Sequence, residues 1–190
     1  FNVAVSADEV APVLLVRILN MPHKTDGTLD FDGVDDYVEI KSIQEIQNAD
    51  GINNPFSFEF WAKAHDRNSQ YDGFINFLSS AGDYRGIIVS FNNSDTSFRV
   101  RYWQDGGTNI TWTSNPLDNW LHIGVVVADN VITVYENGEV VATGIFTNPF
   151  SFNGDVILAD YVWQHERLEG MLTEVRIWNV ARTQAEIQAD

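Results

Sequence analysis

Four aspartates lie close together around one glycine near the start of the chain. Asp30, Asp32, Asp35 and Asp36 flank Gly33. Calcium binds about six to eight oxygen atoms, and a glycine lets the backbone turn tightly enough to add carbonyl oxygens to the carboxylates. Carboxylates at this spacing also repel one another unless a cation lies between them. The cluster therefore predicts a calcium site, with an ordinary acidic surface turn as the alternative.

A second group of oxygen-bearing side chains occupies every second position of a later segment. Asp66, Asn68, Gln70 and Asp72 project to one side of an extended chain, just before Gly73. Such a row has the ligand types for a second calcium ion, but we favour a solvated connector between strands.

Basic and aromatic side chains share one face of a predicted strand further along the chain. Sugar rings stack on indoles, and arginine binds a carboxylate through two parallel hydrogen bonds. A glycine-rich turn follows this strand, and a later irregular segment has the aromatic content of a contact surface. We interpret five residues as candidate carbohydrate ligands with a preference for an anionic sugar, namely Arg99, Arg101, Trp103, Asp105 and Trp163.

Two alternatives compete with this interpretation. Glu59, Trp61 and Lys63 also face away from the apolar side of their strand, so they extend the platform if the two strands are neighbours. One alternative is that Trp61 and Trp103 pack beneath long loops as a small second core. The other is that the two arginines pair with Glu59 and its neighbours across strands, each pair contributing tenths of a kcal/mol.

The elements that must position these residues are strands. Apolar and polar residues alternate with a period of two through most of the chain, as in 56–62. Asn137-Gly138 between two such runs is a strong hairpin signal. Thr183 and Glu186 form a capping box that predicts a short helix. About twelve strands exceed what one open sheet holds, so we predict an all-β, two-sheet antiparallel jelly-roll sandwich with a short C-terminal helix.

The alternation of apolar and polar residues is missing from the N-terminal part of the chain. Residues 1–27 lack the alternation, so we expect an N-terminal extension or an extra strand there and one domain over 28–190. The chain has 190 residues, enough to bury a complete core, and no cysteine, which excludes disulfides and thiol catalysis. Because the sequence begins at Phe1 without a signal-like segment, we expect it to be one module of a larger protein.

The charge of the chain limits its partners. There are 11 Lys and Arg against 27 Asp and Glu, which gives a net charge of −16. Such a chain repels nucleic-acid phosphates and anionic membrane surfaces, and it carries no basic stripe to offset this. No apolar run approaches the roughly 20 residues of a membrane span, so we also expect no membrane insertion.

A series of motifs occurs in order along residues 28–188. They are LDFDGVDDYV at 29–38, FSFEFW at 56–61, WLHI at 120–123, YENGE at 135–139 and EVRIWN at 174–179. Together they resemble the laminin-G-like domains of the concanavalin A-like lectin/glucanase superfamily. The resemblance implies one convex and one concave sheet, with carbohydrate-type ligands at the concave face or at the rim loops.

The same resemblance implies a structural calcium ion near the first and last strands, and it nominates Asp32, Gly33 (through its carbonyl) and Glu174 as ligands. Glycanases of the superfamily that act by double displacement carry Glu-x-Asp-x-x-Glu on one strand, and this chain lacks that motif. We therefore expect a non-catalytic, calcium-stabilised carbohydrate-binding module that is secreted or at the cell surface. Its expected partners are a glycosylated surface and neighbouring domains of its own chain. A protein–protein adhesion module, or a glycanase or lyase, is the alternative.

Overall fold

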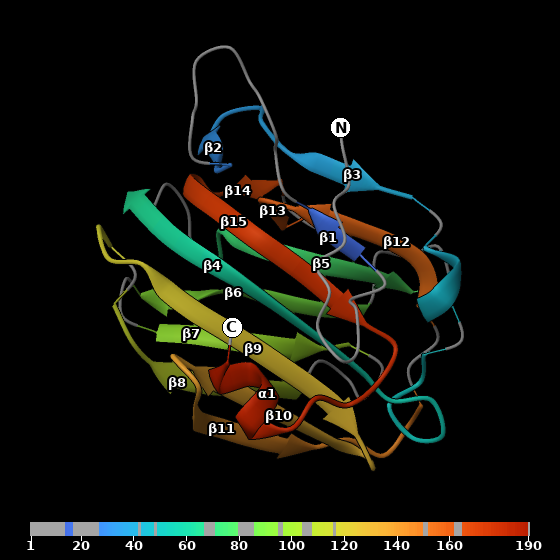
Figure 1. Cartoon of the computed structure of the whole chain (residues 1–190). Helices are drawn as coiled ribbons and strands as arrows, with labels where there is room; N and C mark the ends of the chain where they lie inside the picture. The colour runs from blue at the N-terminus through green and yellow to red at the C-terminus, as the bar shows by residue number, and fades with distance from the viewer. Residues whose placement is uncertain are drawn as a thin grey trace.

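The computed structural model confirms the predicted all-β fold. Two sheets pack face to face, and one short helix follows near the C-terminus (Figure 1). Among the described residues, no helix has the length and hydropathy needed to cross a membrane. The structure describes residues 14–16, 27–41, 43–47, 49–66, 71–79, 86–94, 97–103, 108–115, 117–149, 152–161 and 165–189.

The first sheet has seven antiparallel strands in the order β1-β15-β4-β9-β10-β11, with β2 also paired to β15. It joins the two ends of the described chain, because β1 and β2 both pair with the last strand. Its strands are β1 (Leu14–Val16), β2 (Leu29–Asp32), β4 (Phe56–Asp66), β9 (Leu121–Ala128), β10 (Val131–Glu136), β11 (Glu139–Ile145) and β15 (Glu169–Trp178).

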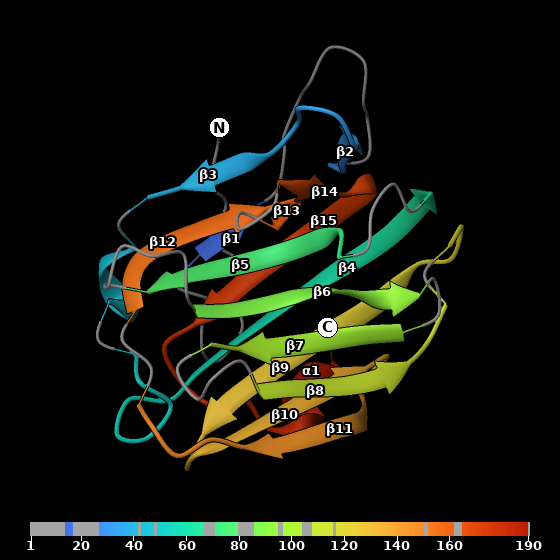
Figure 2. The same cartoon turned by 180° about the vertical axis from the view of Figure 1, so that it is seen from behind.

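The second sheet has eight strands in the order β13-β14-β5-β6-β7-β8, with β12 paired to β5 and to β3 (Figure 2). Its pairs are antiparallel except for β14 and β5, which meet in parallel at one position. A short 3₁₀ helix, η1 (Gln44–Ile46), follows β3. The strands are β3 (Val38–Ile40), β5 (Gly73–Ser79), β6 (Gly86–Ser94), β7 (Ser97–Tyr102), β8 (Thr108–Thr113), β12 (Phe152–Leu158), β13 (Asp160–Tyr161) and β14 (Glu166–Arg167).

The core lies between the two sheets and is rich in phenylalanine. Phe56, Phe58 and Phe60 alternate along β4 and are buried, as the period-two pattern predicts. Phe58 meets Phe77 of β5 across the interface, with ring centroids 4.5 Å apart. Because alternate residues fill the core, the residues between them project to the outer faces of the two sheets.

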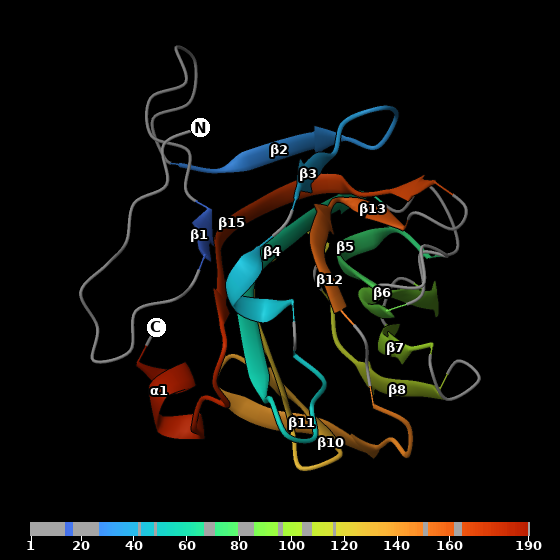
Figure 3. The ribbon, with the colours of Figure 1, turned by 90° about the vertical axis from the view of Figure 1, so that its right-hand side faces the viewer.

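Two local predictions are confirmed at the C-terminal end. Asn137 and Gly138 turn between β10 and β11 with φ of 51° and 81°, the left-handed conformation that this hairpin type requires. Thr183 caps helix α1 (Gln184–Gln188), and Glu186 completes the capping box. The helix lies against the outer face of the seven-stranded sheet (Figure 3).

Candidate functional site

Three arginines lie on one outer face of the sandwich, that of the eight-stranded sheet. Arg99 and Arg101 come from β7, where the residues between them fill the core. Arg99 stands opposite Ser90 of β6, and Arg101 stands opposite Ile88. Arg167 comes from β14, beside the start of β5. A chain with 11 basic residues in all thus places three of them on one sheet face.

Arg99 is buried although it points away from the core. Its side chain is 1% exposed, and its guanidinium lies 3.9 Å from the ring centre of Tyr71 and 5.4 Å from that of Tyr161. Its Nε donates to Ser90 Oγ at 3.0 Å, whereas its Nη2 has no hydrogen-bond partner. Burial lowers the pKa of Arg99, and the charge of Arg101 acts in the same direction. Within the described part of the chain, no carboxylate neutralises this guanidinium.

Arg101 and Trp103 form a half-buried pair at the end of β7. The guanidinium of Arg101 lies 3.6 Å from the ring centre of Trp103, which is a cation–π contact. The Nε of Arg101 is buried and has no hydrogen-bond partner. The pair therefore presents a guanidinium stacked on an indole, with the Arg101 Nε donor buried beneath the surface.

The floor of this face contains an unexpected amide. Asn76 of β5 is fully buried, and neither its Oδ1 nor its Nδ2 has a hydrogen-bond partner. The register aligns it with Ile88 of β6, and hence with Arg101 of β7. Sequence analysis missed Asn76, although one polar residue inside the apolar run 73–78 was the available signal.

The rim beside Arg99 is built by β13 and β14. Asp160 is 3% exposed; its Oδ2 lies 3.3 Å from His165 Nδ1 and 3.8 Å from Arg167 Nε. Burial raises the pKa of Asp160, while the contacts with His165 and Arg167 lower it in part. A glycine makes this arrangement possible, because a Cβ on Gly73 would lie 2.5 Å from the backbone nitrogen of Tyr161.

The structure contradicts the platform shared between the two predicted strands. Glu59, Trp61 and Lys63 belong to β4 of the seven-stranded sheet, so they lie on the other outer face from Arg99 and Arg101. The alternation in the sequence fixes the face of a strand but not the sheet that the strand joins. Pairing of the two arginines with Glu59 is wrong for the same reason.

Other candidate residues fall outside what the structure describes. Asp105 and Trp163, the remaining carbohydrate candidates, belong to segments that are not described. Asn68 and Gln70, from the second group of oxygen-bearing side chains, also lie outside the described residues. Asp72 of that group is fully buried, so it is not part of a solvated connector.

Three of the four aspartates around Gly33 lie close together in space, whereas a carboxylate oxygen of the fourth, Asp30, lies 4.0 Å from His65 Nε2. Carboxylate oxygens of Asp32, Asp35 and Asp36 lie within 4.8 Å of one another, and all three side chains are exposed. Two ligands on opposite sides of a calcium ion, each at roughly 2.4 Å, are about 4.8 Å apart, so these donors fit that ion. The backbone N–H of Val34 donates to Asp32 Oδ1 at 2.8 Å and lowers the pKa of Asp32.

Glu174 does not join this cluster. The register of β15 and β2 places Glu169, not Glu174, opposite Asp32. Glu174 is five residues further along β15, which is roughly 16 Å in an extended strand. Its carboxylate lies 3.1 Å from Arg176 Nη2 instead. Glu174 therefore lies too far from Asp32 and Gly33 to share one ion with them, and ligation by Asp32 and Gly33 stays a prediction.

Comparisons with known proteins agree with the fold. The family model of the concanavalin A-like lectin/glucanases superfamily matches residues 32–188. A comparison with curated proteins gave no match. Among solved structures, domain 4 of AbnA, a GH43 extracellular arabinanase from Geobacillus stearothermophilus in complex with arabinotriose, has a TM-score of 0.57 and 19% identity. The match covers 74% of this chain and 69% of that chain.

Two further structures share the fold at low identity. The botulinum neurotoxin serotype G binding domain has a TM-score of 0.66 and 11% identity, over 85% of this chain and 41% of that chain. The native heptameric SAP-like pentraxin from Limulus polyphemus has a TM-score of 0.54 and 19% identity, over 71% of this chain and 68% of that chain. At these identities the likeness establishes the architecture alone.

Proposed function

The chain belongs to the concanavalin A-like lectin/glucanase superfamily, and we propose that it is a non-catalytic carbohydrate-binding module. Its ligand rests on the outer face of the eight-stranded sheet, over Arg101 and Trp103. The observation that carries this proposal is the half-buried stack of Arg101 on Trp103, which lies beside the buried guanidinium of Arg99, with no carboxylate partner for either arginine among the described residues.

The chemistry of this face favours an acidic sugar. A carboxylate or sulfate bound at the half-buried Arg101 gains charge-assisted hydrogen bonds, and it brings a negative charge close to the buried Arg99, which lacks a counter-ion among the described residues. Trp103 supplies an aromatic surface beside Arg101, on which a sugar ring can stack. The ligand class is therefore a uronate, a sialic acid or a sulfated sugar rather than a neutral one.

The structural neighbours support a lectin-like role. The arabinanase domain was determined with arabinotriose bound, and the neurotoxin neighbour is a binding domain. The arabinanase is extracellular. By this likeness we place the present module outside the cell or at its surface, as part of a larger protein.

Binding to acidic oligosaccharides tests this proposal. Arg101→Ala is expected to weaken binding of a uronate- or sialate-containing oligosaccharide about tenfold to a hundredfold, because a charged hydrogen bond contributes roughly 1.5–3 kcal/mol. Trp103→Ala is expected to act in the same direction through lost stacking. Isothermal titration after a glycan-array screen measures both effects.

Lys41→Ala is the matched control, since it also removes one positive charge but lies in an exposed pair with Glu39. It should leave the affinity unchanged. Equal binding by wild type and both site variants would contradict the proposal. Binding to a protein surface that survives deglycosylation would instead indicate an adhesion module. Polysaccharide cleavage that Asp160→Asn abolishes would show an enzyme.

Calcium belongs to this proposal as a stabilising ion. The donors that fit it are the carboxylates of Asp32, Asp35 and Asp36. All are hard oxygen ligands, and the exposed site leaves room for water to complete the coordination. The ion would hold the loop between β2 and β3, where these three carboxylates otherwise repel one another.

Removal of calcium is expected to lower the melting temperature. Calcium at a hundredfold excess over its Kd stabilises by about 2.7 kcal/mol, which corresponds to roughly 5–10 °C for a chain of this size. Calorimetry with chelator and with added calcium measures the shift. Asp32→Asn combined with Asp36→Asn should abolish it, whereas Glu174→Ala should not. A wild-type melting temperature that is the same with chelator and with added calcium would contradict the calcium site.

A further inference from the structure

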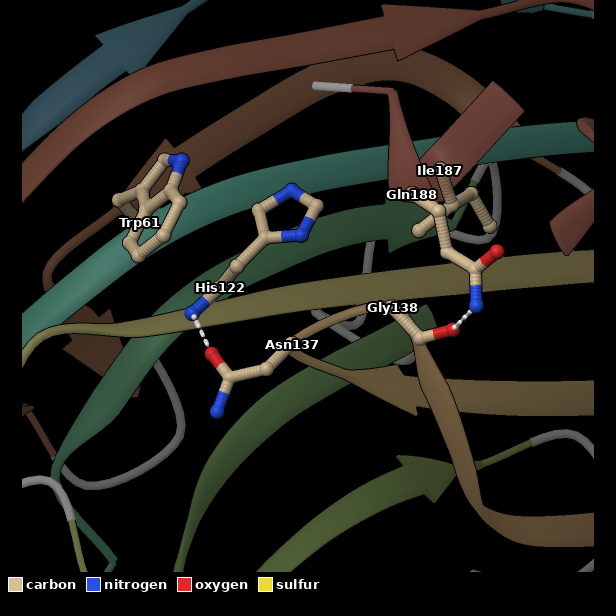
Figure 4. Close-up of a pocket in the computed structure, with 6 residues that line it drawn as sticks. All are labelled: Trp61, His122, Asn137, Gly138, Ile187 and Gln188. Atoms are coloured by element: carbon tan, nitrogen blue, oxygen red, sulfur yellow. Dashed lines mark hydrogen bonds between the residues drawn. The ribbon is translucent and has the colours of Figure 1, made fainter. Parts of the chain in front are cut away.

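A small pocket lies on the outer face of the seven-stranded sheet (Figure 4). The arginines lie on the other side of the sandwich, on the eight-stranded sheet. Strands β4 and β9, the turn between β10 and β11, and helix α1 form the walls of the pocket. Its volume is about 200 Å³. Sites for drug-sized ligands are larger, roughly 300–1,000 Å³, so this pocket has room for one ring. The lining residues are Trp61, His122, Asn137, Gly138, Ile187 and Gln188.

One side of the pocket is aromatic. The indole of Trp61 is half-buried, and its centroid lies 5.2 Å from that of His122. Trp61 faces outward from β4 and takes no part in the core between the sheets. On the opposite side, Ile187 of α1 is buried against the sheet. The pocket therefore presents a flat apolar surface at the molecular boundary.

The other side offers two amides, each of which uses only part of its hydrogen-bonding capacity. Asn137 Oδ1 accepts from the backbone N–H of His122 at 3.1 Å, which leaves its Nδ2 without a partner among the described residues. Gln188 Nε2 donates to Gly138 O at 3.1 Å and to Glu139 Oε1 at 3.2 Å. The Oε1 of Gln188 therefore has no hydrogen-bond partner among the described residues. One donor and one acceptor thus stand near the indole.

These amides are held in place by the backbone. The positive φ of Asn137 and Gly138 fixes the turn. Gly138 also lets the helix approach, because a Cβ there would lie 2.7 Å from Gln188 Cγ. A site built on a rigid turn and a docked helix loses little conformational entropy when a ligand binds.

Among the described residues that line the pocket, there is no cation that an acidic ligand could use. His122 is the one ionisable side chain among them, and its Nε2 lies 2.9 Å from Glu59 Oε2. The net charge of −16 further disfavours an anion. Stacking surface, amide donor and amide acceptor without charge are the groups that recognise a neutral sugar ring.

We propose that this pocket binds one neutral sugar ring, as a free monosaccharide or as the terminal residue of a glycan. The ring stacks on Trp61, and its hydroxyl groups bond to Asn137 and Gln188. This site is independent of the acidic-sugar face, because it lies on the other sheet and has the opposite charge preference.

Nuclear magnetic resonance of the ¹⁵N-labelled chain tests the proposal. The indole N–H signal of Trp61 and the side-chain amide signals of Asn137 and Gln188 should shift on titration with galactose, glucose, mannose or N-acetylglucosamine, with a millimolar Kd. The same sugars as terminal residues of disaccharides form the second arm. Whichever arm binds more tightly identifies the source of the ligand.

Trp61→Ala and Gln188→Ala should each weaken this binding about tenfold. Trp120→Ala is the matched control, because Trp120 is exposed but does not line the pocket. Arg101→Ala should also leave it intact, which separates this site from the proposed function. If Trp61→Ala does not fold, the loss of sugar binding is tested with Gln188→Ala alone. Unshifted signals with every sugar, or binding that survives both variants, would overturn the proposal.

Discussion

Arg182→Ala is expected to lower the free energy of unfolding by about 3–5 kcal/mol, because it leaves a charged glutamate buried without its main partner. The Glu59 side chain is 1% exposed, and Arg182 Nη1 donates to its Oε1. Arg182 also donates to Glu186 O at 2.8 Å and lies 4.1 Å from the ring centre of Trp178. One side chain thus ties α1 to the sheet beneath it.

The helix depends on contacts with the sheet, and Arg182 supplies several of them. Its five residues are far too few for an isolated helix, since helices shorter than about 12–15 residues are marginal in water. Urea denaturation measures the loss of stability, and Lys41→Ala, from an exposed ion pair, should cost at most about 1 kcal/mol. Replacing Glu59 and Arg182 together by apolar residues should recover much of the loss. A cost for Arg182→Ala no larger than that of the control would contradict a buried anchor.

Local signals in the sequence were enough to predict the architecture. Period-two alternation identified the side of β4 that faces the core between the sheets, because a strand places alternate residues on opposite faces. Asn137-Gly138 predicted its hairpin because few other residues accept two positive φ values in succession. Thr183 and Glu186 predicted the start of α1 because the capping hydrogen bonds form within three residues. Each of these features is decided by neighbours in the chain.

The candidate site needed information that neighbours in the chain do not supply. Whether Glu59 meets Arg99 depends on which sheet each strand joins, and the pairing of strands is decided across the whole chain. Whether Glu174 reaches Asp32 depends on the register of β15 with β2, and a few positions of offset separate the two carboxylates completely. The burial of Arg99 arises from Tyr71 and Tyr161, which approach it from other parts of the sequence.

Phe77→Ala is expected to cost about 3–5 kcal/mol, which is a large part of the roughly 5–15 kcal/mol that stabilise an ordinary domain. Phe77 is fully buried, and its ring centre lies 4.5 Å from that of Phe58, 5.8 Å from that of Phe56 and 5.2 Å from that of Phe152. Truncation to alanine therefore removes contacts to both sheets and leaves a cavity between them.

The position of Phe77 in β5 links this stability to the candidate site. Its neighbour Asn76 is buried with both amide atoms unpartnered, which destabilises the fold, and the aromatic core must offset that cost. Phe77→Leu keeps most of the volume and should cost less than about 1.5 kcal/mol, while Ile145→Ala, at a position 75% exposed, should cost about 0.5 kcal/mol or less. Denaturant unfolding of the three variants measures the free energy of unfolding that each one loses and so ranks them. A Phe77→Ala variant as stable as Ile145→Ala would show that the two sheets are held together elsewhere.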